Sequence, residues 1–454
     1  MALSDTINHD LRTLFHEGRK VLDEGGAGIV NAYREEAFAA FEKAGGIPCG
    51  TEEYRYTDLL PVFGREYAAV LKRETLRPSD LNDAFRCAAR DLAAWTVLTL
   101  NGHGCENNAR EDLPDGVIVC SLREAALQHG DLLAKHYNRY TFPGQKDSLV
   151  FLNTAFAQDG VFVYIPDGVV LERPLQLINF LRGERDLMTF QRNLIVVGKR
   201  AEARIVVCEH TLSDHYFLLN AVTELRLEEG AKTDYYQVQN QYLGTALINS
   251  LFVSQQRDSF FESNTATLYG GLIRNNQYVR LEGAGGTCNL YGVYILDKSQ
   301  HADTCTYVEH AAPDCTSRQH FKGVLDDASI ANFSGCVRVE PHAQRTESFQ
   351  ANNNLLLTDT ARINSKPQLI IDADDVKCSH GATVGQMDEE ALFYLRSRGI
   401  GETEARTMLM FGFAHDVIRR VKLEPLREEI DELIEKRLRG ELSKCHNCIM
   451  QCKK

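Results

Sequence analysis

The sequence has no long apolar run. No stretch of the 454 residues approaches the ~18–20 consecutive apolar residues that a membrane-spanning helix needs. The N-terminal stretch MALSDTINHDLRTLFHEGRK is polar and amphipathic, and it lacks the apolar segment of a signal peptide. We therefore expect a cytoplasmic protein that makes no use of a membrane.

The common nucleotide and hydrolase motifs are also missing. The P-loop pattern GxxxxGK[ST] does not occur, because VGKRAE at Val197–Glu202 lacks both the upstream glycine and the final hydroxyl residue. The glycines of EGAGGTC, Glu282–Cys288, lie between strand-like runs rather than before a helix. Neither GxSxG nor HExxH is present. These absences exclude a self-sufficient ATPase, an α/β-hydrolase and a zincin metalloprotease.

Positive charge is scarce. The formal net charge is −13, with 50 Lys and Arg against 63 Asp and Glu, and no long basic cluster occurs. Proteins that bind nucleic acids gain much of their affinity when cationic side chains release counterions from phosphates. A chain this acidic is therefore not expected to bind nucleic acid, and the same charge disfavours anionic membranes.

Cysteine is plentiful but does not suggest a disulfide framework. The 13 cysteines are an odd number, and a reducing cytosol keeps thiols free. We predict that the cysteines in apolar surroundings are small core residues. They are Cys87, Cys120, Cys208 and Cys336.

The first of three regions, residues 1–145, is predicted to be mainly helical. Apolar residues recur there at helical spacing in two stripes. The first stripe comprises Tyr33, Ala37, Ala40, Phe41 and Ala44, and the second comprises Leu81, Phe85, Ala88, Leu92 and Trp95.

The second region, residues 146–386, has a different pattern. From about Leu149, short strand-like runs alternate with turns rich in Asn, Asp and Gly, and helical spacing is nearly absent. Apolar patches recur at a period in the high twenties, which is within the range of solenoid repeats. The patches lie near Val196, Leu225, Val253, Val279, Val308, Val337 and Ile370. A parallel β-helix explains this pattern better than a sandwich, whose strands would recur about every 8–12 residues.

The third region, residues 387–454, is predicted to be helical again. The acidic residues 388–390 suit the first turn of a helix, Gly399 suits its end, and Thr403 suits the N-cap of the next helix. Two apolar stripes support those helices: Ala391, Leu392 and Leu395, then Ala405, Met408, Leu409 and Phe413. A last helix carries a stripe whose packing partner the sequence does not identify: Leu426, Ile430, Leu433, Ile434 and Leu438.

The stretch DADDVKCSHGATVGQ contains the residues of greatest chemical interest. In an extended chain Cys378 and His380 point to one side and Ser379 to the other, because strand side chains alternate. A thiolate and an imidazole on one side are suitable ligands for iron or zinc, with the remaining ligands supplied from elsewhere. A buried structural pair and a Cys/His catalytic dyad are the alternatives. The preceding carboxylates, Asp372, Asp374 and Asp375, resemble either a solvated turn or the acidic cluster of a β-helix carbohydrate enzyme.

The C-terminal tail SKCHNCIMQCKK forms a second candidate metal site. Cys445, Cys448 and Cys452 would share one face of a continued helix, with His446 as a fourth donor. The alternative is a frayed terminus whose thiols have no role.

Several segments closely resemble the SufB/SufD family of the SUF iron–sulfur cluster assembly machinery, and in particular its SufD members. The longest is KCSHGATVGQMDEEALFYLRSRGI, residues 377–400. NLLLTDTARINSKPQL precedes it, MFGFAHDVI follows it, and EYRYTDL lies near the N-terminus. Together these segments span most of the chain. The middle region resembles the family in its alternation of strand-like runs and turns rather than in a specific motif.

The resemblance implies a right-handed parallel β-helix flanked by two helical regions. It also implies a non-enzymatic subunit that pairs its β-helix with a SufB-like paralogue and contacts a SufC-like ABC ATPase through residues 387–421. Iron or a nascent Fe–S cluster would be held transiently at the paired interface, with His380 as the first ligand and Cys378 as the second. No intrinsic cofactor is expected.

Two differences indicate the SufD side of the family. SufB members have a cysteine where this chain has Ala361, and a glutamate where it has Gly381. The family pattern does not include the CxxCxxxC tail, so the resemblance assigns no role to Cys445, Cys448 and Cys452. A homodimer of the isolated chain, a carbohydrate-active β-helix enzyme and a metal carrier using the tail stay open as alternatives.

Overall fold

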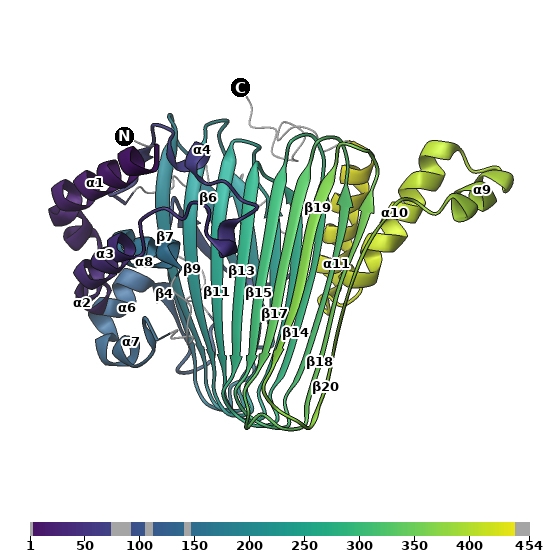
Figure 1. Cartoon of the computed structure of the whole chain (residues 1–454). Helices are drawn as coiled ribbons and strands as arrows, with labels where there is room; N and C mark the ends of the chain where they lie inside the picture. The colour runs from purple at the N-terminus through teal and green to yellow at the C-terminus, as the bar shows by residue number, and fades with distance from the viewer. Residues whose placement is uncertain (1–2, 74–91, 105–111, 140–146, 441–454) are drawn as a thin grey trace.

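Two ten-stranded sheets facing each other dominate the fold (Figure 1). The computed structural model describes residues 3–73, 92–104, 112–139 and 147–440. From β5 to β20 the chain alternates between sheet A, which holds the odd-numbered strands, and sheet B, which holds the even-numbered ones, and neighbouring strands pair in parallel. The result is a parallel β-solenoid, which confirms the predicted mainly-β fold with helical regions at both ends.

Each sheet consists of ten strands within the described residues. Sheet A holds β4 (Ile118–Ser121), β5 (Val161–Ile165), β7 (Leu187–Val197), β9 (Phe217–Leu227), β11 (Thr245–Gln255), β13 (Leu272–Leu281), β15 (His301–His310), β17 (Ile330–Val339) and β19 (Arg362–Ile371), with β1 (Ala68–Ala69) beside β7. Sheet B holds β3 (His103–Gly104), β2 (Trp95–Leu100), β6 (Leu175–Leu181), β8 (Glu202–Thr211), β10 (Lys232–Asn240), β12 (Phe260–Tyr269), β14 (Thr287–Leu296), β16 (Thr316–Leu325), β18 (Thr346–Leu356) and β20 (Val376–Gly385).

The helices of the described residues precede and follow this solenoid. The N-terminal ones are α1 (Leu3–Gly25), α2 (Gly28–Ala32), α3 (Arg34–Lys43), η1 (Glu52–Tyr54), α4 (Leu60–Phe63), α6 (Leu122–Gln128), α7 (Gly130–His136) and α8 (Ser148–Phe156). The C-terminal ones are α9 (Glu389–Ser397), α10 (Glu402–Ile418) and α11 (Glu424–Leu438).

The recurring apolar positions of the sequence stack into one buried row of sheet A. Consecutive Cα partners along this row are Ile195, Leu225, Val253, Val279, Val308, Val337 and Leu369. The row differs from the predicted one at its two ends, where Ile195 and Leu369 replace Val196 and Ile370. A shift of one residue moves a side chain to the opposite face of a strand, and Ile370 accordingly lies exposed on the outside.

The N-terminal region differs from the mainly helical prediction at two places. The first stripe forms α3 as expected. Of the second stripe, Leu81, Phe85 and Ala88 fall outside the described residues, and Trp95 begins strand β2 because it continues the stack of sheet B. Conversely, Leu149 lies in helix α8 rather than in a strand. The division into 1–145, 146–386 and 387–454 remains our proposal.

Buried ion pairs fasten the N-terminal segments to the outer face of sheet A. Arg192 on β7 contacts Glu224 on β9 at 2.6 Å, and it also donates to Asn153 and Thr154 of α8. Arg274 pairs with Asp303, and its guanidinium lies 3.8 Å from the ring centre of Tyr54. At this end the N-terminal helices cover the first coils (Figure 1).

The C-terminal helices pack on the outer face of sheet B. The stripe of α11 is buried there through Leu426, Ile430 and Ile434, so it packs within the chain rather than on a partner. Arg437 ties the helix to Asp297 through two hydrogen bonds of 2.6 and 2.8 Å. In contrast, α9 projects away from the solenoid beyond β20 (Figure 1).

The details at the C-terminal helix ends differ slightly from the prediction. Asp388 is the N-cap of α9, accepting hydrogen bonds from the amides of Glu390 and Ala391. Gly399 follows the helix with φ +88°, as a terminating glycine does. The N-cap of α10 is Gly401, and the predicted Thr403 lies inside the helix. Among the described helices, none is long and apolar enough to span a membrane.

The interior of the solenoid contains polar side chains as well as apolar ones. Amide groups bridge the two sheets, as where Gln239 donates to Asn275 at 2.7 Å. Glu209 on β8 is fully buried and accepts one hydrogen bond, from Asn179 at 2.8 Å. Its second oxygen has no partner, and burial raises the pKa of its carboxyl from 4.5 to about 7.

We expect Glu209→Gln to stabilise the fold at neutral and alkaline pH. A carboxyl whose pKa is raised in the folded state costs stability as pH rises from 4.5 to about 7. At ~1.4 kcal/mol per pKa unit, the loss that the amide removes is about 3–4 kcal/mol. Urea unfolding of both proteins at about pH 5 and about pH 8 measures it. If the free energy of unfolding of the two proteins depends equally on pH, the pKa of Glu209 is not raised in the folded state.

Candidate functional site

The last coil of the solenoid, formed by β19 and β20, is an open end. Each of these strands terminates the pairing order of its sheet, so one edge of each has no strand beside it among residues 3–73, 92–104, 112–139 and 147–440. The opposite end is covered by N-terminal helices, whereas no helix covers this one in Figure 1. Large apolar side chains are exposed at it: Ile370, Ile371 and Val384.

Cys378 and His380 both lie on β20, on the side that faces the solenoid interior. Their Cα partners on β18 are Ser348 and Gln350, which are buried, whereas Ser379 pairs with the outward-facing Phe349. The predicted alternation is therefore confirmed. No further coil covers β20 within the described part of the chain, and His380 is exposed there while Cys378 is partly buried against the cluster around Val337 and Val339. The pair is not a buried structural pair in the chain by itself.

Beneath Cys378, hydroxyl groups lead into the interior. Ser348 and Ser317 lie 2.8 Å apart between their Oγ atoms, and Ser317 Oγ lies 2.8 Å from His310 Nε2. Burial lowers the pKa of His310 to about 3, so this imidazole is neutral. Burial also raises the pKa of the Cys378 thiol, partly offset by the backbone of Ser348. In the chain alone Cys378 is therefore protonated at neutral pH, and binding a metal would release that proton.

Beneath His380, amide groups take the place of the hydroxyls. Gln350 Nε2 donates to Gln319 Oε1 at 3.1 Å, and Thr306 donates to the same oxygen at 2.6 Å. The imidazole of His380 makes no hydrogen bond to any described residue. Cys378 and His380, the two potential ligands, thus lie at the open end. Serine hydroxyl groups stack beneath Cys378, and glutamine amide groups stack beneath His380.

The residues that would complete a metal site are absent from the described part of this end. Ala361 is buried immediately before β19 and offers no ligand atom. A side chain at Gly381 would meet open space. Within the described residues, no group of three or more His, Cys, Asp or Glu side chains could hold a metal ion. The predicted tail ligands Cys445, Cys448 and Cys452 lie outside those residues.

The acidic residues before Cys378 do not form a shared site. Asp372 accepts a hydrogen bond from Arg338 at 3.0 Å, and the Asp375 backbone exchanges hydrogen bonds with Gln344 and Arg345. They belong to the turn between β19 and β20, and the geometry gives no support to a carbohydrate-cleaving carboxylate pair.

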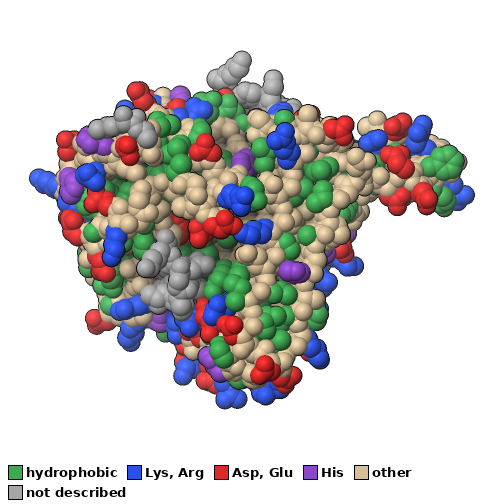
Figure 2. Space-filling view, viewed as in Figure 1, with side chains coloured by type: hydrophobic (Ala, Val, Ile, Leu, Met, Phe, Trp, Pro, Cys, Tyr) green, Lys and Arg blue, Asp and Glu red, His purple; other side chains and the backbone are tan. Residues whose placement is uncertain are grey.

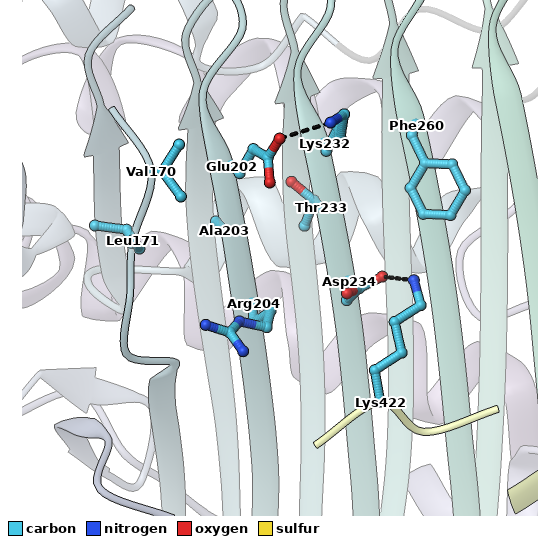
Figure 3. Close-up of a pocket in the computed structure, with 10 residues that line it drawn as sticks. All are labelled: Val170, Leu171, Glu202, Ala203, Arg204, Lys232, Thr233, Asp234, Phe260 and Lys422. Atoms are coloured by element: carbon cyan, nitrogen blue, oxygen red, sulfur yellow. Dashed lines mark hydrogen bonds and ion pairs between the residues drawn. The ribbon is translucent and has the colours of Figure 1, made fainter. Parts of the chain in front are cut away.

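A hollow on the outer face of sheet B lies far along the solenoid from this pair (Figure 3). Four of its charged side chains form ion pairs, Glu202 with Lys232 at 2.6 Å and Asp234 with Lys422 at 2.6 Å, and Arg204 donates to the backbone carbonyl of Glu172. Lys422 also contacts Glu262 at 3.1 Å. These contacts hold the segment before α11 on the sheet. The residues around the hollow are Val170, Leu171, Glu202, Ala203, Arg204, Lys232, Thr233, Asp234, Phe260 and Lys422.

Exposed apolar side chains on α9 and α10 form a second candidate surface, which we call the α9–α10 patch. It consists of Phe393 (74% exposed), Tyr394 and Met408. Figure 2 shows hydrophobic side chains at the tip of the projecting segment. Met408 lies in α10, as its helical spacing predicted, and its side chain is exposed although Ala405 of the same stripe is buried. Phe393 and Tyr394 do not belong to the apolar stripe of Leu392 and Leu395. Their position outside that stripe was the sequence signal that could have indicated an exposed apolar surface.

Of the cysteines predicted as core residues, two are buried as expected and one is not. Cys120 and Cys208 are buried, and burial raises the pKa of Cys208 to about 12. Cys336 is only partly buried, on the outward side of β17. Cys87 is outside the described residues.

Comparison with known proteins identifies two regions of family similarity. Residues 180–413 match the SUF system FeS cluster assembly, SufBD core domain, and residues 5–177 match the SufBD protein N-terminal region. The iron–sulfur cluster assembly protein SufD of Escherichia coli is 31% identical over 333 residues, 72% of this chain and 78% of that protein. SufD of Bacillus subtilis is 27% identical over 332 residues, 72% and 76% of the two chains. A SufBD family protein of Synechocystis is 28% identical over 394 residues, 84% and 85%.

Proposed function

The chain belongs to the SufBD family of the SUF system and is a component of iron–sulfur cluster assembly; on that premise we propose that it is a SufD-type subunit whose open end pairs with a SufB-like paralogue. Iron and the nascent cluster are its substrates, held transiently between the two chains. The observation that carries this proposal is the position of Cys378 and His380 on the unpaired terminal coil. When two metal ligands lie on an uncovered strand edge, the chain that covers that edge can supply the remaining ligands of the metal.

The physical character of the open end supports pairing through the sheets. Two exposed strand edges of ten residues each present rows of unpaired backbone groups, which another chain satisfies by adding strands. The exposed Val384 lies on the same side of β20 as the two ligands, and the exposed Ile371 lies on β19, so a partner that covers this coil would also bury apolar surface. A second copy of this chain is the alternative occupant when the paralogue is absent.

The chemistry of the pair suits iron. Imidazole and thiolate are both iron ligands, and two ligands leave coordination positions for the partner and for sulfide. Ser379 faces the outside of sheet B and takes no part. The role of Cys445, Cys448 and Cys452 stays a prediction.

The α9–α10 patch is proposed as the contact for a SufC-like ABC ATPase, within residues 387–421. It projects from the solenoid, so a partner can approach it without displacing α10 or α11 from sheet B. Aromatic residues and methionine are enriched at the centres of protein interfaces, and an isolated apolar patch rarely remains uncovered on a protein surface.

We expect Phe393→Ser together with Met408→Ser to weaken ATPase binding by at least about tenfold, because exposed anchors of this size each contribute ~1–2 kcal/mol or more when buried. Titration calorimetry with the purified ATPase measures the change. Leu127→Ser serves as the control. It changes an exposed apolar side chain (63%) on α6, away from the α9–α10 patch, and this variant is expected to bind the ATPase normally. Normal binding by the double variant would place the ATPase contact elsewhere.

Co-purification tests the proposal as a whole. The chain is mixed with a SufB-like paralogue and a SufC-like ATPase, and the complex is analysed for iron and sulfide under anaerobic conditions. We expect one complex containing all three chains, with cluster formed only when both β-solenoid subunits are present. A chain that stays separate, or that forms cluster without the paralogue, would overturn it.

A further inference from the structure

Gln350 on β18 has a buried oxygen atom without a partner. Its side chain is 3% exposed, and its Nε2 atom donates to Gln319 Oε1 on β16, the preceding strand of sheet B. Its Oε1 atom makes no hydrogen bond. A buried carbonyl oxygen without a donor costs roughly 1–3 kcal/mol, so a donor that reaches this oxygen would gain a favourable interaction.

The residue directly above Gln350 in the stack is His380. The two are Cα partners across parallel strands, and both side chains face the interior row. Because Nε2 is used by Gln319 on β16, the amide oxygen is the polar atom of this side chain that remains for a group on β20. Parallel strands lie ~4.8 Å apart, so a rotation of the exposed imidazole brings a ring N–H within reach of this oxygen.

We infer that Gln350 is a positioning residue for His380: its Oε1 atom accepts one ring N–H and thereby leaves the other ring nitrogen free to bind iron at the open end. Histidines that bind metals usually donate their second N–H to an oxygen, which fixes the tautomer and the orientation of the ring. The Gln350 amide is held through its hydrogen bond to Gln319 Oε1, an oxygen that also accepts from Thr306. The inference rests on the proposed function, in which His380 is an iron ligand.

The interior offers a matched control. Gln277 on β13 is also a buried inward-facing glutamine whose Oε1 atom has no partner, and its Nε2 contacts Thr265. It lies several coils away from β20. Gln350→Leu and Gln277→Leu therefore remove the same kind of group from the same kind of environment, and only the first is next to His380.

The test observes the ring nitrogens of His380 by NMR, with the full chain labelled at histidine and the signal assigned through His380→Ala. At alkaline pH we expect one dominant tautomer in the natural protein and in Gln277→Leu, and a mixture of tautomers in Gln350→Leu. Gln350→Glu keeps an oxygen acceptor and is expected to restore the single tautomer. An unchanged His380 signal in Gln350→Leu, or a mixture already in the natural protein, would overturn the inference.

Cluster assembly with the partner chains gives the second measurement. Gln350→Leu is expected to slow assembly by about tenfold, the usual effect of removing a residue that orients a metal ligand. If Gln350→Leu shifts the tautomer but His380→Ala assembles cluster normally, the proposed function fails while the positioning stands. If His380→Ala is inactive and Gln350→Leu is unaffected in both measurements, the positioning alone fails.

Discussion

A chain with lysine at two apolar positions of its open end, Val384→Lys and Ile371→Lys, is expected to lose its β-solenoid partner. Both side chains are exposed in the isolated chain, so the fold should be unaffected. In the paired complex each ammonium would be buried without a counter-ion, which costs about 3–5 kcal/mol. At tenfold per ~1.4 kcal/mol, the affinity should fall by at least about 100-fold.

Analytical ultracentrifugation of the mixed chains measures this loss, and Val170→Lys provides its control. Val170 has the same exposed fraction as Val384, 53%, but lies between β5 and β6, at the other end of the solenoid. We expect Val170→Lys to pair normally. If both variants pair with full affinity, the partner does not use the open end. If the double variant also abolishes a self-association seen in the isolated chain, the same surface forms the homodimer.

His380→Ala is expected to give the largest loss of cluster assembly among single substitutions. Removal of a residue that merely orients a ligand typically costs 10–100-fold, so loss of the ligand itself should reduce the rate by about 100-fold or more. The imidazole is exposed and contacts no described residue through a hydrogen bond, so stability should change by less than about 0.5 kcal/mol. Binding of the paralogue and the ATPase should be retained.

The rate of cluster formation in the reconstituted complex, followed by absorbance under anaerobic conditions, checks this expectation. His9→Ala removes another exposed imidazole, on α1 at the opposite end of the chain, and should leave the rate unchanged. Wild-type cluster yield from His380→Ala would remove His380 from the site and leave Cys378 as the remaining candidate.

The sequence by itself determined the type of fold and the residue pair of interest. Apolar residues recurring at Leu225, Val253, Val279 and Val308 require a stack of coils, because no single coil can bury them alone. The alternation of a strand also placed Cys378 and His380 on one side, since this depends only on local backbone geometry. The family resemblance then indicated the chemistry of that pair.

The tertiary structure decided what surrounds these residues. That β20 is the last strand, that Gln350 lies below His380, and that Phe393 stands on a helix without a covering element all depend on pairing between residues far apart in the chain. Turn lengths vary from coil to coil, so the sequence alone does not fix the register of each strand. An error of one residue in the predicted register, as at Ile370, exchanges the inward-facing and outward-facing side chains of that strand. Local patterns therefore indicate that strands stack, but only the assembled sheets show which end remains open.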